Sequence, residues 1–153
     1  MAVEIKSRRL SATLRSGKKV NIPAWTLDSG KPGPAFLLVA AQHGNEVQGC
    51  EVVRRFVQLA SEKMLCGQVF AVPFANVPAL RQRRPHINMK PEQPYADDRG
   101  HNMNRTWSGK HKGNDTARVS QAIYRAFGDH LGDIEGLVLS FNGHDLEPLT
   151  FKP

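Results

Sequence analysis

The sequence predicts one α/β domain with a central mixed, largely parallel sheet and helices on both faces. Residues 35–41 form an uninterrupted apolar run, which is typical of a strand buried on both faces. Residues 51–66 carry apolar side chains at helical spacing, and a second apolar run follows at 68–75. A strand, a helix and a strand within about 40 residues indicate a parallel crossover. The chain of 153 residues is long enough to bury a core.

The segment before this crossover predicts a hairpin. Residues 3–14 and 20–27 alternate between apolar and polar side chains, and the turn-forming residues 16–18 lie between them. Proline has no backbone N–H, so Pro23 places the second strand at an edge or in a bulge. Residues 28–34 are a loop by composition.

The segment after the crossover is less regular. Residues 76–113 carry four prolines and little apolar periodicity, and a loop of this length is functional or disordered. The stretch Asn114-Asp115-Thr116 predicts the N-cap of a second amphipathic helix. Residues 134–141 predict a third core strand, which ends shortly before His144.

Composition narrows the class of protein. The net charge of +7 favours anionic partners, but the basic residues are scattered and not interleaved with aromatic ones, so nucleic acid is the weaker expectation. No apolar run approaches the roughly 20 residues of a membrane span, and the N-terminus has no signal-peptide core. Cys50 and Cys66 form no metal-binding or redox motif, which favours a cytoplasmic protein with reduced thiols.

His43 and Glu46 are candidate metal ligands. They lie between a buried strand and its helix, where chemistry gathers in open α/β sheets. Imidazole nitrogen and carboxylate oxygen both suit Zn²⁺, and a catalytic zinc takes three protein ligands. The alternative is that Glu46 only favours the positive end of the helix dipole.

A third ligand should come from another strand end, and His144 has that placement. The alternative is an exposed histidine near the end of the chain. Four other histidines compete for the role: His86, His101, His111 and His130.

Arginine and amide side chains predict an anion site. Asn104 and Arg105 are adjacent in the long loop, with Arg83 and Arg84 upstream. The planar guanidinium group binds carboxylates through two hydrogen bonds, and a neighbouring amide adds orientation. The alternative is a solvated basic loop that contacts phosphate.

Three motifs in order resemble the succinylglutamate desuccinylase/aspartoacylase family, relatives of the zinc carboxypeptidases. They are His-Gly-Asn-Glu at 43–46, Asn-Val-Pro-Ala at 76–79 and Asn-Arg-Thr-Trp-Ser-Gly at 104–109. The resemblance covers roughly residues 35–140 and implies a zinc carboxypeptidase-like fold.

The resemblance implies a zinc-dependent deacylase that cleaves the amide bond of an N-acyl amino acid. His43 and Glu46 would bind Zn²⁺, which acts as a Lewis acid on the scissile carbonyl. Asn104 and Arg105 would hold the substrate carboxylate, and Arg83 or Arg84 would polarise the carbonyl.

The chain departs from the family pattern in three places. Family members carry Asp-x-His after the third core strand, where this chain has Asn142-Gly143-His144, so His144 would act as a displaced third ligand. No glutamate is assigned as general base, and Ser108 replaces the usual proline. We therefore expect residues 1–153 to be a domain that is incomplete at its C-terminus, with hydrolysis weakened by truncation.

Two rivals remain open. One is a non-catalytic α/β module that binds anionic ligands or nucleic acid through its basic loop. The other is an unstable fragment whose strands lack sheet neighbours.

Overall fold

The computed structural model of the chain describes residues 2–94, 96, 99–131, 137–142 and 145–148. Its strands form one six-stranded sheet in the order β1-β2-β4-β3-β5-β6. The strands are β1 (Glu4–Thr13), β2 (Lys19–Asp28), β3 (Ala35–Val39), β4 (Gln68–Val72), β5 (Leu137–Asn142) and β6 (Asp145–Pro148).

The sheet is mixed, and the prediction of a largely parallel sheet is wrong. Among the described strands, β3 alone is parallel to the neighbours on both of its sides, which are β4 and β5. The pairs β1–β2, β2–β4 and β5–β6 are antiparallel. The connections explain this, because the short β1–β2 and β5–β6 links allow only antiparallel pairing, whereas β3, β4 and β5 are joined through helices.

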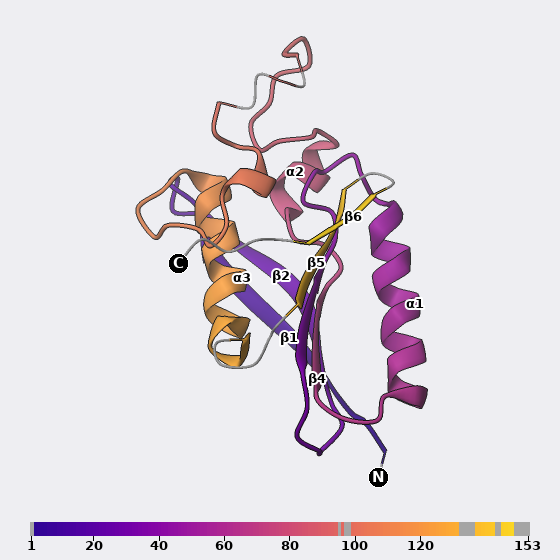
Figure 1. Cartoon of the computed structure of the whole chain (residues 1–153). Helices are drawn as coiled ribbons and strands as arrows, with labels where there is room; N and C mark the ends of the chain where they lie inside the picture. The colour runs from indigo at the N-terminus through magenta and orange to yellow at the C-terminus, as the bar shows by residue number, and fades with distance from the viewer. Residues whose placement is uncertain (1, 95, 97–98, 132–136, 143–144, 149–153) are drawn as a thin grey trace.

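Helices cover both faces of the sheet, as predicted. Helix α1 (Gln48–Lys63) lies on one face and α3 (Asp115–Leu131) on the other (Figure 1). Successive residues of β3 alternate between the two cores. Leu37 and Val39 belong to the core under α3, and Leu38 belongs to the core under α1. The apolar run is therefore buried on both sides, as a central strand requires.

The predicted hairpin is confirmed, and so is the special position of Pro23. Strand β1 pairs with β2 along its whole length. Strand β4 pairs with β2 only from Trp25 to Asp28. Pro23 therefore lies where β2 pairs with β1 alone. At such an edge position, the missing N–H of proline does not remove a hydrogen bond to a second neighbouring strand.

The long predicted loop contains two short helices that periodicity does not reveal. Helix α2 (Val77–Gln82) begins at Asn76, whose side chain accepts a hydrogen bond from the Ala79 N–H, and it has a proline in its first turn. The 3₁₀ helix η1 spans Met103–Arg105. The predicted start of α3 is confirmed, since the Ala117 N–H donates to Asn114 Oδ1 at 2.9 Å.

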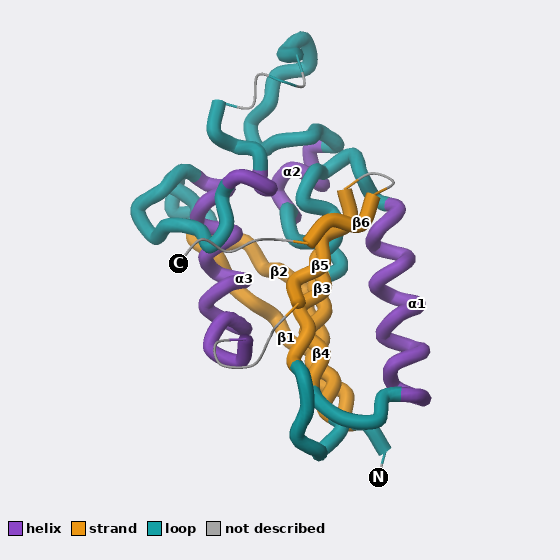
Figure 2. Tube along the Cα trace, in the orientation of Figure 1, coloured by secondary structure: helices purple, strands orange, loops and turns teal. Residues whose placement is uncertain are grey.

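The loops that follow β3 and β4 gather at one end of the sheet (Figure 2). The Ala75 N–H donates to the Ala40 carbonyl at 2.9 Å, and the Asn76 N–H donates to the Ala41 carbonyl at 3.0 Å. These bonds hold the two segments side by side beyond the strands. Polar groups on them therefore share the sheet edge where parallel α/β proteins carry ligands.

Candidate functional site

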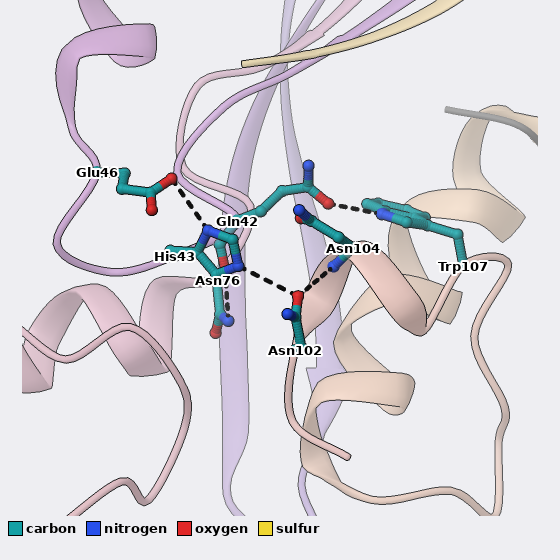
Figure 3. Close-up of polar contacts among 7 residues, drawn as sticks. All are labelled: Gln42, His43, Glu46, Asn76, Asn102, Asn104 and Trp107. Carbon is teal, nitrogen blue, oxygen red and sulfur yellow. Dashed lines mark hydrogen bonds and ion pairs between the residues drawn. The ribbon is translucent and has the colours of Figure 1, made fainter. Parts of the chain in front are cut away.

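A buried histidine and a carboxylate face each other at this edge (Figure 3). Nδ1 of His43, a residue only 3% exposed, lies 3.0 Å from Oε2 of Glu46. The Glu46 N–H donates to the His43 carbonyl at 3.2 Å, so both belong to one turn just before α1. The predicted pair is therefore brought together, with both donor atoms pointing at the same space.

The turn begins with strained backbone. Ala41 has φ +52°, in the left-handed region, where a side chain costs about 1 to 2 kcal/mol. This conformation turns the chain sharply out of β3 immediately before Gln42 and His43. Strain of this kind persists where surrounding contacts fix it, as the hydrogen bond from Asn76 does here.

Gly44 lets the turn pack directly on α2. A Cβ built at this position would overlap the carbonyl group of Ala79, and the Gly44 N–H donates to the Pro85 carbonyl at 3.2 Å. The glycine of the His-Gly-Asn-Glu motif is thus required by close backbone approach. It also fixes the loop that carries Arg83 and Arg84 beside the His43 turn.

Two buried amides tie the segments together. Asn76 Nδ2 donates to the Gln42 carbonyl at 2.9 Å. Gln42 Oε1 in turn accepts from the Trp107 indole N–H at 2.6 Å (Figure 3). Sequence reasoning missed Gln42, because a glutamine at a strand end carries no periodic or capping signal.

The segment around η1 reaches the histidine itself. His43 Nε2 lies 3.2 Å from Asn102 Oδ1, and the same oxygen accepts from the Asn104 N–H at 3.2 Å. The side-chain oxygen of Asn104 is buried and has no hydrogen-bond partner within the part of the chain that the structure describes. Asn104, a predicted substrate-binding residue, therefore lies beside the His43–Asn102 contact, with a buried polar atom that a ligand could satisfy.

The predicted arginines surround this cluster less tightly. Arg83 ends α2 with φ +51° and is exposed, as is Arg105, whereas Arg84 is partly buried. Among the described residues no carboxylate forms an ion pair with any of the three. Their guanidinium groups are not neutralised by the described part of the protein.

The competing histidines separate into distinct environments. His86 is buried and packs edge-on against the His43 ring, with centroids 5.4 Å apart. His101 Nδ1 lies 3.0 Å from Thr116 Oγ1, and His111 is exposed. His144, like the side chain of His130, lies outside the described residues.

No group of three metal-ligating side chains converges within the described ranges. Both cysteines are unpaired by disulfides, and burial raises the pKa of the Cys50 thiol, which keeps it protonated near neutral pH. Of the three predicted metal ligands, the described residues bring together two, His43 and Glu46.

Comparison with known proteins identifies the family. The model of the succinylglutamate desuccinylase/aspartoacylase catalytic domain matches residues 32–139. The chain belongs to this family. A search of curated proteins found no significant match.

Several solved structures share the fold. An aspartoacylase family protein from Mesorhizobium loti is 24% identical with a TM-score of 0.72, covering 90% of this chain and 40% of its own. The ectoine utilization protein EutE from Ruegeria pomeroyi is 25% identical with a TM-score of 0.59, covering 82% of this chain and 36% of its own. A metallo-carboxypeptidase from Burkholderia cenocepacia is 17% identical with a TM-score of 0.58, covering 82% of this chain and 33% of its own.

These matches confirm the predicted family and the carboxypeptidase-like α/β fold. The chain spans about two fifths of the length of the aspartoacylase family protein and of a succinylglutamate desuccinylase of known structure that it matches. By the name of its model, the family is one of deacylases. None of the described helices is both long and apolar enough to span a membrane.

Proposed function

We propose that this chain carries the zinc-binding part of a deacylase that cleaves the amide bond of an N-acyl amino acid. The observation that carries the proposal is the approach of His43 Nδ1 to Glu46 Oε2 at 3.0 Å, in a buried turn at the carboxyl end of β3. Membership of the desuccinylase/aspartoacylase family supports the reaction class.

The two donor atoms fit a zinc ion. Zinc binds imidazole nitrogen and carboxylate oxygen at about 2.0–2.2 Å, so two tetrahedral ligands of one ion lie about 3.3–3.6 Å apart. The His43–Glu46 separation of 3.0 Å is a hydrogen-bond distance, and the pair would open by a few tenths of an ångström to hold the ion. In the proposal His43 and Glu46 hold the ion, and His144 is the third ligand. When bound, Zn²⁺ supplies Lewis-acid polarisation of a carbonyl group.

The substrate carboxylate is assigned to Asn104 and Arg105. Arg105 is exposed and forms no ion pair among the described residues, so its two-point donor face can meet a small carboxylate. Asn104 lies in the same short helix, and its buried side-chain oxygen can accept a hydrogen bond from the substrate. Arg83 or Arg84, held near the His43 turn through the Pro85 carbonyl, is proposed to polarise the scissile carbonyl.

Zinc titration of the metal-free protein tests the metal half of the proposal. We expect the protein to bind one zinc ion in competition with a chromophoric chelator. His43→Ala and Glu46→Gln should each weaken binding at least about 100-fold, since even outer partners of a ligand are worth 10- to 100-fold. His111→Ala, which alters an exposed histidine, is the matched control and should bind like the parent.

An assay for released amine tests the deacylase half, with N-succinylglutamate as the substrate. Zinc-dependent release that His43→Ala abolishes and His111→Ala preserves would support it. Zinc uptake unaffected by His43→Ala would contradict the assigned site, whatever the hydrolytic rate.

A further inference from the structure

We propose that β1 and α3 form a groove that binds an extended acidic segment of another protein as an added strand. Strand β1 is the outermost strand of the sheet, and no other described strand pairs with its outer edge. Helix α3 packs beside it on one face of the sheet (Figure 1). None of the residues that line this groove belongs to the proposed zinc site, so the inference is independent of the proposed function.

The backbone groups that face the outer edge follow from the geometry of the hairpin. The Leu14 N–H donates to the Lys18 carbonyl at 2.9 Å, so the even-numbered residues of β1 form the hydrogen-bonded pairs with β2. The odd-numbered residues, from Ile5 to Thr13, therefore direct their N–H and C=O groups away from β2. The Thr13 carbonyl agrees with this direction, because it accepts a hydrogen bond from the Arg118 guanidinium of α3 at 3.4 Å.

Two hollows of about 490 and 420 Å³ make up the groove, and Leu10 and Ala126 line both of them. Four consecutive residues, 10–13, line the second hollow. Because side chains of a strand alternate between its faces, a wall of consecutive residues means that this hollow runs along the edge of β1. The opposite wall is the side of α3 that carries Arg118 and Arg125. A free strand edge with side-chain contacts beside it is what the binding of a peptide by strand addition requires.

The lining of the groove is predominantly basic. Its lysine and arginine side chains are Lys6, Arg8, Arg9, Arg118 and Arg125. Both of its carboxylates already have partners. Glu4 pairs with Lys6 at 2.9 Å, and Asp28 accepts hydrogen bonds from the Gly30 N–H and from the Gln68 amide, each at 2.7 Å.

Three of the arginines are available to a ligand. Arg8, Arg9 and Arg125 are exposed, and none of them forms an ion pair among the described side chains. Arginine binds carboxylates through two hydrogen bonds, so acidic side chains are the groups that this lining complements.

The pleat of β1 defines which residues of the partner would be acidic. Leu10 and Ala12 belong to the core under α3, so Lys6 and Arg8, at the same alternation, also face the α3 side. Every second side chain of an added strand would lie on this side, beside Arg8 and Arg125. The partner is therefore an extended segment with acidic residues at alternate positions.

The same charges disfavour a second copy of this chain as the occupant. Strand β1 itself carries three cations and one carboxylate, so pairing two copies along this edge would bring like charges together. Charged side chains on an edge strand protect it against pairing with its own kind. An acidic strand does not meet this barrier.

The experiment titrates the full chain into a fluorescently labelled peptide of alternating glutamate and threonine, at physiological ionic strength, and follows the anisotropy. We expect saturable binding. A peptide of alternating glutamate and proline carries the same charge but lacks half of the backbone N–H groups, and a peptide of alternating lysine and threonine has the opposite charge. Neither should bind.

Hydrogen exchange of the backbone amides locates the peptide. Amides of Ser7, Arg9 and Ser11 face outward, and we expect their exchange to slow at least about 10-fold when the acidic peptide is saturating. Exchange at these three positions that is unchanged by bound peptide would overturn the proposal.

Variants test the charge and the edge separately. Arg8→Glu combined with Arg125→Glu should weaken peptide binding at least about 10-fold. Lys31→Glu combined with Lys90→Glu changes the net charge equally at exposed positions outside the groove, and should bind within about twofold of the parent.

Ser11→Pro removes one outward N–H without touching the hydrogen bonds to β2, and should also weaken binding at least about 10-fold. Ser11→Thr keeps the N–H and is the matched control. Urea denaturation of both variants verifies that they fold.

Three results would contradict the proposal. Equal binding of the glutamate–proline peptide, or unchanged affinity in a folded Ser11→Pro variant, would exclude strand addition. Binding of single-stranded oligodeoxythymidine without binding of the acidic peptide would assign the groove to nucleic acid. A dimer in sedimentation that protects the outward amides of β1 would assign the edge to a second copy of the chain.

Discussion

The His43–Glu46 turn and the arginines near it are held in very different ways. His43 is buried, contacts Glu46, Asn102 and His86, and follows a backbone fixed by hydrogen bonds from the segment after β4. Arg83 and Arg105 are exposed and form no ion pairs among the described residues. The fold fixes one set of groups before any ligand arrives and leaves the other set adjustable.

This difference corresponds to different chemical demands. A metal ion requires donor atoms within a few tenths of an ångström, so its ligands need a rigid, buried support. A carboxylate is larger and can be met by long side chains that lose rotamer freedom only on binding. Substitutions in the turn should therefore change folding and metal binding, whereas substitutions of the arginines should change only ligand binding.

The largest effect is expected at Gly44. In Gly44→Ala the new Cβ would overlap backbone atoms of Ala79, which cannot move without shifting α2. We expect a loss of about 3 kcal/mol in the free energy of unfolding, at the upper end for overpacking, measured by urea denaturation. Gly17→Ala is the control, because Gly17 has φ +83° and open space around it, and it should lose only about 1 to 2 kcal/mol. Equal losses in the two variants would show that the turn is not packed against α2.

Asn76 should have the next largest effect. Asn76→Ala leaves the Gln42 carbonyl and the Ala79 N–H without their buried partner, at a cost of about 2 kcal/mol. Asn76→Asp keeps the acceptor for Ala79 but buries a carboxylate opposite the Gln42 carbonyl oxygen, so its loss should be at least as large. Urea denaturation measures both, with the exposed Asn21→Ala as control. A loss at Asn76 no greater than at Asn21 would contradict the structural role.

Arg105→Ala should leave the fold intact and weaken ligand binding. A charge-assisted pair with the ligand contributes about 1.5–3 kcal/mol, so N-succinylglutamate should bind the zinc-loaded protein at least about 10-fold more weakly by calorimetry. The free energy of unfolding should stay within about 0.5 kcal/mol of the parent. Arg125→Ala, an exposed arginine on α3, is the control. Unchanged affinity in Arg105→Ala would remove this residue from the carboxylate site.

The same difference explains what the sequence could predict. Uninterrupted or periodic apolar patterns indicated β3, α1, β4 and α3, because the positions of these elements that face the core carry apolar side chains. The spacing of His43 and Glu46 indicated their meeting, because three residues span one turn. The direction of the β2–β4 pairing and the short helix α2 had no such pattern, since they depend on contacts between distant segments.

The contacts of single polar side chains were the least predictable part. Asn102 and Gln42 reach the site through hydrogen bonds across 59 and 65 residues of chain, to His43 and Trp107 respectively. Such contacts arise only after the sheet has formed, and no local pattern in the sequence marks them. The third ligand assigned to His144 lies outside the described residues and stays a prediction.

The smallest effect concerns Glu51, which lies five residues after Glu46 but on the exposed side of α1. Hydrogen bonds from Arg54 and then Arg55 lower the pKa of Glu51 from 4.5 to about 2. Because the folded pKa lies below the unfolded one, its contribution to stability is complete above pH 4.5 and is lost as the pH falls toward 2.

Glu51→Gln should therefore reduce stability only slightly at pH 7, since exposed ion pairs contribute little. The difference from the parent should shrink between pH 4.5 and about 2. NMR titration of the Glu51 carboxyl group should give a midpoint near 2 at low salt, rising toward 4.5 in concentrated salt as the arginines are screened. A midpoint near 4.5 at low salt would show that Arg54 and Arg55 do not hold this carboxylate. Zinc affinity should be the same in Glu51→Gln and the parent, in contrast to Glu46→Gln, because charge on the outer surface of α1 does not set the geometry of the buried turn.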